Sequence, residues 1–159
     1  MRITPEFEDF AQLYGAGRAQ VVWTTLVADL ETPVSAMLKL ARGAPNSFLL
    51  ESVEGGDVRG RYSIIGLRPD VIWRCNGNVS EINRAAQAGD GDGDGGGFEP
   101  CPAGALDSLR DLVAESRIDL PEELPPMAAG LVGYLGYDTV RLMERLRSPG
   151  PDPLGLPDG

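Results

Sequence analysis

The sequence predicts an α+β fold in which a mainly antiparallel sheet has helices packed on one side. Four short apolar runs between Ser47 and Ile82 are separated only by turn residues, and such short connections favour antiparallel pairing over parallel crossovers. Other segments repeat apolar residues at helical spacing and are bounded by Gly or Pro. At 159 residues the chain is long enough to bury a core within one domain.

The first part of the chain predicts a helix, a strand and a second helix. Thr4-Pro5 is a typical helix start, and the residues that follow place apolar side chains on one face until Gly15 ends the run. The stretch Gln20–Ala28 is rich in β-branched residues and predicts a strand. Thr32-Pro33 predicts the start of the second helix, which ends near Gly43.

The middle of the chain predicts two antiparallel strand pairs. The expected strands are Phe48–Glu51, Tyr62–Leu67, Val71–Cys75 and Val79–Ile82. The Asn76-Gly77-Asn78 turn joins the last two as a hairpin.

The later part alternates flexible and regular segments. Ala88–Gly97 is a low-complexity Gly/Asp run, and this composition predicts a flexible acidic loop. The run is not a calcium-binding loop, because the glutamate that such a loop requires is missing. Ala103–Ser116 predicts a helix, Met127–Leu135 an inner strand and Tyr137–Arg147 a helix. We therefore expect one domain over residues 1–147 and a proline-rich linker over residues 148–159 that leads to a further domain.

Composition excludes several functions. The chain has 14 Lys plus Arg against 24 Asp plus Glu, a balance that repels phosphate backbones and argues against a nucleic-acid partner. It contains no histidine, so a Ser–His–Asp triad or a Cys–His catalytic pair is not possible within it. No apolar run approaches ~20 residues and the N-terminus lacks a signal region, so we expect neither a membrane partner nor secretion but a cytoplasmic location.

The two cysteines give no sign of a metal site. Cys75 and Cys101 are isolated in the sequence and lack the CxxC spacing of zinc ligands. Their spacing leaves a disulfide possible, although free thiols are the expectation in the cytoplasm.

The end of the first strand pair carries the candidate binding residues. Glu51 and Ser52 lie at the end of one strand. Arg61, Tyr62 and Ser63 open the next, so a hairpin brings the two groups close together. Polar groups beside apolar walls suit a small amphipathic ligand such as an amino acid with a large side chain. From spacing alone, an ordinary solvated strand end, with Glu51 paired to an arginine and Ser52 capping a turn, is the favoured explanation of Glu51 and Ser52. For Tyr62 and Ser63, an ordinary strand and a binding site explain the sequence equally well.

A resemblance extends this interpretation. The segments LLES and GRYSIIG, together with ETPVSAMLKL, AGLVGYLGYD and PDPLGLPD, resemble the N-terminal region of anthranilate synthase component I, in the same order. The resemblance implies that LLES helps to form an allosteric pocket for tryptophan. It assigns Leu50 to the indole, Ser52 to the amino-acid head group and Tyr62 to the opposite lip, while Glu51 either attracts the ammonium or holds the loop in shape. It also implies that these elements complete a larger two-sheet sandwich.

The resemblance also implies what the longer parent protein does. Such enzymes convert chorismate, with ammonia that a glutamine amidotransferase subunit (component II) supplies, to anthranilate and pyruvate. They use Mg²⁺, whose ligands lie in the C-terminal chorismate-binding region, so we expect no catalytic residue, no metal ligand and no activity in this segment alone. Two alternatives stay open: the equivalent region of aminodeoxychorismate synthase, which serves folate synthesis, and a freestanding amino-acid-binding module.

Overall fold

The computed structural model describes residues 2–51, 62–86, 97–147, 150 and 152–159. The chain forms two compact units, one made of Met1–Glu31 and Val113–Leu131, the other of Thr32–Leu112 and Val132–Gly159. Both contain helices, and the second contains two antiparallel sheets, so the predicted α+β class is confirmed.

The first unit is built around α1 (Phe7–Gly15). An isolated antiparallel bridge joins Thr4 to Trp23 through two backbone hydrogen bonds of 2.8 Å. The side chain of Gln20 donates to the carbonyl of Phe10. This hydrogen bond attaches the segment that follows α1 to the helix.

The second unit begins with α2 (Pro33–Ala41), and its start is as predicted. The Thr32 side chain accepts from the Ser35 amide while the Ser35 hydroxyl accepts from the Thr32 amide, which satisfies two amides that the first helical turn leaves unpaired. The helix packs against both strands of the next hairpin, β1 (Phe48–Leu50) and β2 (Ile64–Gly66). These strands are antiparallel, with Phe48 opposite Gly66 and Leu50 opposite Ile64, as the sequence predicted.

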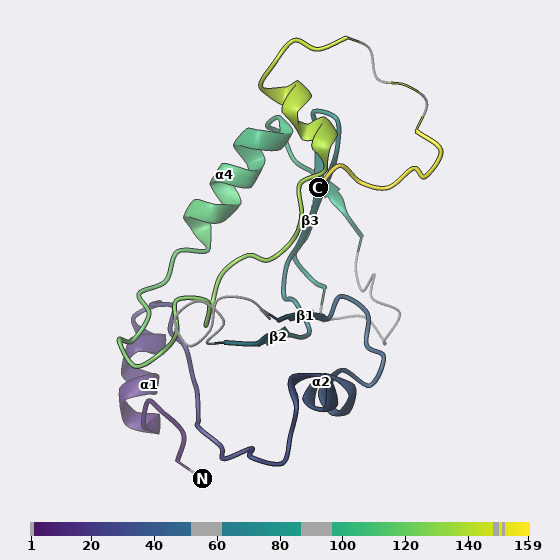
Figure 1. The fold of residues 1–159 in the computed structure, drawn as a ribbon. Coiled ribbons are helices and arrows are strands. Elements are labelled where there is room, and N and C mark those ends of the chain that lie inside the picture. Colours follow the sequence, from purple (N-terminus) through teal and green to yellow (C-terminus); the bar gives the residue numbers. More distant parts are fainter. Residues whose placement is uncertain (1, 52–61, 87–96, 148–149, 151) are drawn as a thin grey trace. The chain divides into compact units, whose positions relative to one another are not determined.

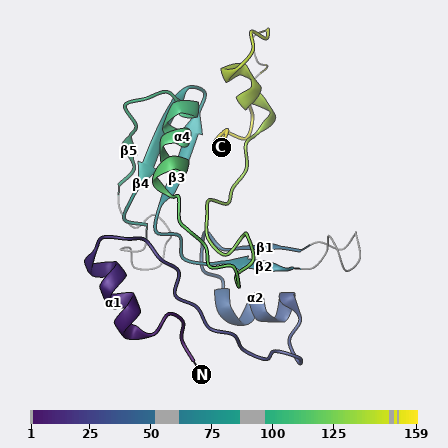
Figure 2. The same ribbon diagram turned by 90° about the vertical axis from the view of Figure 1, so that its left-hand side faces the viewer.

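A three-stranded sheet and α4 carry most of the buried residues of this unit (Figures 1 and 2). The strand order is β3 (Ile72–Asn76), β4 (Val79–Asn83), β5 (Glu99–Pro100). The predicted turn joins β3 to β4, and Gly77 has the positive φ of 53° that favours glycine there. Helix α4 (Ala105–Glu115) covers one face, where Ser108 bonds to Trp73 of β3 and Ser80 of β4.

The last residues of the chain lie along the outer edge of β3. Cys75 exchanges backbone hydrogen bonds with Asp158 and Gly159, at 2.8 and 2.9 Å. The carbonyl of Asp158 also accepts from the Gly136 amide at 2.7 Å, just before the short 3-10 helix η1 (Tyr137–Leu142). The proline-rich segment therefore ends as an ordered part of the sheet edge.

Several sequence predictions were wrong in detail. Gln20–Ala28 and Met127–Leu135 form no strand, since only Trp23 pairs, and Leu131, Val132 and Leu135 are exposed. Thr4 does not cap the first helix, because its backbone is engaged with Trp23. The helix predicted over Tyr137–Arg147 is 3-10 and ends at Leu142. The expected acidic loop falls almost entirely outside the described residues.

Candidate functional site

The predicted binding residues lie at the end of the β1–β2 hairpin where the chain passes from the first strand to the second. Leu50 is the last residue of β1, and Glu51 follows it directly. Tyr62 precedes β2 by two positions, so antiparallel pairing returns it to the end at which Glu51 leaves the sheet. Ser52 lies outside the described residues. The hairpin thus brings Leu50, Glu51 and Tyr62 to one end of the same pair of strands.

These side chains are accessible to a ligand. Leu50 is 43% exposed and Tyr62 is 48% exposed, and Glu51 is also exposed. An apolar side chain beside a carboxylate and a phenol matches the needs of an amphipathic amino acid.

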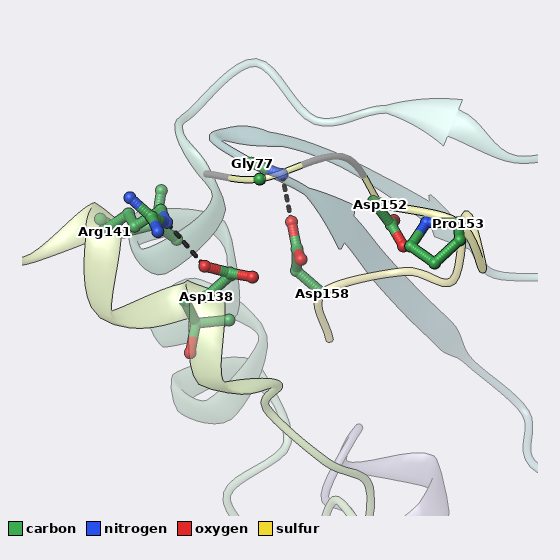
Figure 3. A pocket seen from close by; sticks show the side chains of 9 residues that line it. Gly77, Asp138, Arg141, Asp152, Pro153 and Asp158 are labelled. Carbon is green, nitrogen blue, oxygen red and sulfur yellow. Dashed lines mark hydrogen bonds and ion pairs between the residues drawn. The ribbon is translucent and has the colours of Figure 1, made fainter. Parts of the chain in front are cut away.

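A hollow of about 490 Å³ lies elsewhere in the second unit, between η1, the β3–β4 turn and the C-terminal segment (Figure 3). Its lining includes Asp138, Arg141, Asp152 and Asp158, and none of the predicted binding residues. The sequence analysis missed this hollow; the only local signal is the Pro-Asp dipeptide that recurs in the last nine residues.

The carboxylates around this hollow each accept a hydrogen bond from the protein. Asp138 accepts from Arg141 Nε at 2.6 Å, and Asp158 accepts from the Gly77 amide at 2.7 Å (Figure 3). Asp152 accepts from the Leu154 amide at 3.0 Å. Across the described parts of the chain, no group of three or more acidic or cysteine side chains is placed to hold a metal ion. Asp158 therefore ties the C-terminal segment to the β3–β4 turn, whereas Asp138 and Asp152 bond within their own local segments.

The two cysteines are free, and the strand order explains why. Cys75 lies opposite Ser80 of β4, and the Cys101 amide bonds to the Ser80 carbonyl from the other side. Two strand spacings of roughly 4.8 Å separate them, beyond the reach of a disulfide. Burial raises the pKa of the Cys75 thiol, and the nearby Asp158 carboxylate raises it further. A thiol of this kind is a poor nucleophile.

None of the described helices has the length and apolar character that a membrane crossing needs.

The chain is similar over almost its whole length to curated proteins named anthranilate synthase component 1. It is 54% identical to the protein of Cereibacter sphaeroides over 152 residues, which cover 96% of this chain and 29% of that protein. It is 42% identical to the Pseudomonas putida protein, with 95% of this chain and 29% of that protein covered. The Thermus thermophilus protein is 43% identical over 84% of this chain and 26% of its own length.

The chain therefore spans less than a third of the length of the curated relatives it matches. No family model matches the chain. No solved structure matches it either.

Proposed function

Because this chain is related by sequence to the anthranilate synthase component 1 proteins, we propose that it is the N-terminal, tryptophan-sensing part of such an enzyme. The supporting observation is the place of Leu50 and Glu51: they lie where the chain leaves β1 toward β2, with Leu50 exposed and Tyr62 preceding β2 at the same end. Tryptophan binds there with its indole on Leu50 and Tyr62. Its ammonium faces Glu51, and Ser52 bonds to the head group.

The whole parent protein carries the activity in this proposal. It converts chorismate and ammonia from glutamine to anthranilate and pyruvate in tryptophan biosynthesis, in the cytoplasm, with a component II amidotransferase as partner. The relatives' name, component 1, supports a second component. Mg²⁺ and the catalytic residues belong to the part of the parent beyond this chain, so the segment alone is inactive. Tryptophan binding here favours a state of the parent in which the active site does not close, and such coupling is typically about 1–3 kcal/mol.

The test uses the full-length protein. Anthranilate formation from chorismate and glutamine is followed by fluorescence at increasing tryptophan, for the wild type and for Ser52→Ala and Glu51→Gln. We expect both substitutions to raise the tryptophan inhibition constant about tenfold or more, the effect of one lost charge-assisted hydrogen bond, with little change in the KM for chorismate. If tryptophan does not inhibit the wild type, or inhibits both variants as strongly, the effector site is not here.

The product of the same assay separates the alternatives. Formation of aminodeoxychorismate in place of anthranilate identifies the folate enzyme. Micromolar tryptophan binding by the 159-residue chain alone, measured by calorimetry, indicates a freestanding module whose pocket is complete. We expect weak binding by this segment, since affinity depends on burying most of the ligand. The name carried by the relatives favours the anthranilate product.

A further inference from the structure

The pair Phe48 and Gly66 has an unusual packing arrangement within the β1–β2 hairpin. The two residues lie directly opposite each other. A Cβ added to Gly66 would overlap Cε1 and Cζ of the Phe48 ring and lie 2.8 Å from Cδ1. The aromatic ring therefore lies across the neighbouring strand, over the bare α-carbon of Gly66.

The space over Gly66, and not its backbone angle, is what requires glycine here. Gly66 is not among the residues with positive φ, so other residues could adopt its conformation. The three atoms nearest to an added Cβ all belong to the Phe48 ring.

The ring shares its face with the predicted indole contact. Side chains alternate along a strand, so Phe48 and Leu50 point to one side of β1, and their partners Gly66 and Ile64 point to the same side of β2. Leu49 and Ile65 occupy the opposite face. Phe48 is half-buried and Leu50 is exposed, so neither residue of this face is fully enclosed by the protein.

We propose that Phe48 and Gly66 together form a flat aromatic floor that positions the ring of the effector and selects for a large planar side chain. Because Gly66 has no side chain, the Phe48 ring can pack flat across the hairpin. In that position the ring extends the apolar surface formed by Leu50 and Ile64. Aromatic rings pack in offset or edge-to-face contacts, so such a floor favours an indole over a branched aliphatic side chain. This inference rests on the proposed effector site and adds the determinant of its specificity.

Two substitutions test the floor in the full-length enzyme by different routes. Phe48→Leu removes the ring but keeps an apolar side chain of similar volume, and Gly66→Ala displaces the ring. We expect each to raise the tryptophan inhibition constant by roughly three- to tenfold, the size of one aromatic contact. The kcat and the KM for chorismate should stay at wild-type values, which a general loss of structure would not allow.

Matched controls lie in the same unit. Gly133→Ala adds a methyl group where nothing lies within 4 Å and where φ is not positive. Leu49→Met keeps the volume of a side chain on the opposite face of β1. Both controls should leave the tryptophan inhibition constant within about twofold of wild type, less than one aromatic contact.

The outcomes separate this inference from the proposed function. If tryptophan inhibits the wild type and Ser52→Ala relieves the inhibition, but Phe48→Leu and Gly66→Ala stay within about twofold of wild type, the aromatic floor is overturned and the effector site stands. If tryptophan does not inhibit the wild type, both the proposed effector site and the aromatic floor are overturned. Weaker inhibition of Phe48→Leu supports the floor even where Gly66→Ala fails to fold.

Discussion

Ser108 holds α4 on the sheet through a set of hydrogen bonds that uses every site on its hydroxyl. Its Oγ accepts from Trp73 Nε1 at 3.0 Å and donates to the Ala105 carbonyl at 3.0 Å. A hydroxyl has only one proton, so Ser80, whose Oγ lies 2.7 Å away, must donate to the second lone pair of Ser108. One buried side chain therefore joins two strands to the helix.

Ser108→Ala should lower the free energy of unfolding by about 1–3 kcal/mol, because it leaves the buried Ser80 hydroxyl and the part-buried Trp73 Nε1 without their acceptor. Urea denaturation followed by tryptophan fluorescence measures this directly. Arg110→Ala is the control, since it removes only an exposed ion pair on the same helix and should change stability by less than about 0.5 kcal/mol. Equal losses for the two variants would contradict the role of Ser108.

The Cys75 thiol should make stability fall at alkaline pH. Its pKa is raised in the folded protein, first by burial and then by Asp158, above the ordinary value of 9.0. The unfolded chain therefore loses this proton more readily, so the contribution of the neutral thiol is fully present below the ordinary pKa and is lost as the pH rises through the folded one.

Measurements of unfolding free energy from pH 8 upward test this titration. Cys75→Ala should flatten the alkaline decline, and Asp158→Asn should reduce it by the smaller part that the carboxylate contributes. Cys101→Ala controls for thiol oxidation during the measurement. A decline equally steep in Cys75→Ala would assign the effect to other groups.

At the scale of elements, the two predicted starts Thr4-Pro5 and Thr32-Pro33 had different outcomes for a physical reason. Thr32 is a reciprocal cap, whereas the backbone of Thr4 is committed to Trp23 and α1 begins at Phe7 without a side-chain cap. The local sequence signal is the same in both places, so a long-range pairing decided between them.

Thr32→Ala should therefore lower the free energy of unfolding by about 1 kcal/mol, the usual effect of losing a helix cap. Thr32→Ser keeps the hydroxyl and serves as the matched variant, expected to stay close to wild type. Thermal unfolding followed by circular dichroism compares them. A Thr32→Ala protein as stable as Thr32→Ser would mean that the capping box contributes nothing.

Strands were predictable where their partner was near in sequence. The Asn76-Gly77-Asn78 turn brings β3 and β4 together locally, and the predicted boundaries are within one residue. Gln20–Ala28 has strand composition, but a strand needs a partner, and only Trp23 finds one within the described residues. Strand β5 is two residues long and includes a proline, so nothing in its composition could indicate it.

The hairpin that carries the candidate binding residues was predictable for the same reason, and the hollow beside η1 was not. Leu50 and Tyr62 come to the same end of a local hairpin whose strands are readable in the sequence. The hollow depends on the bond from Gly77 to Asp158, which are 81 positions apart, and no periodicity or motif encodes such a contact.

At the scale of the whole molecule, this chain exposes much apolar surface. Leu30 is 98% exposed, Tyr137 88% and Val27 87%, whereas the buried apolar residues in the described part of the chain are Ala41, Cys75, Ala105 and Leu112. Exposed apolar patches of this kind mark surfaces that associate with other protein. The sandwich expected in the longer relatives would supply such a cover.

The 159-residue chain alone should therefore self-associate in a concentration-dependent way, while the full-length protein should not do so through these residues. Size-exclusion chromatography with light scattering over a range of concentrations measures this. Replacing Leu30 by Lys, at the most exposed apolar position, should reduce the association. A monodisperse monomer at every concentration would show that the exposed apolar residues do not form a contiguous patch.

The attachment of Asp158 to Gly77 has a consequence for synthesis on the ribosome. The β3–β4 turn emerges early, but the carboxylate that bonds to it belongs to a residue 81 positions later. At about 5–20 residues per second, the nascent hairpin waits roughly 4–16 s with the outer edge of β3 unpaired. During that interval the nascent chain exposes an unpaired strand edge, which can pair with another chain and aggregate. A chaperone that binds the nascent chain would be most useful at this edge.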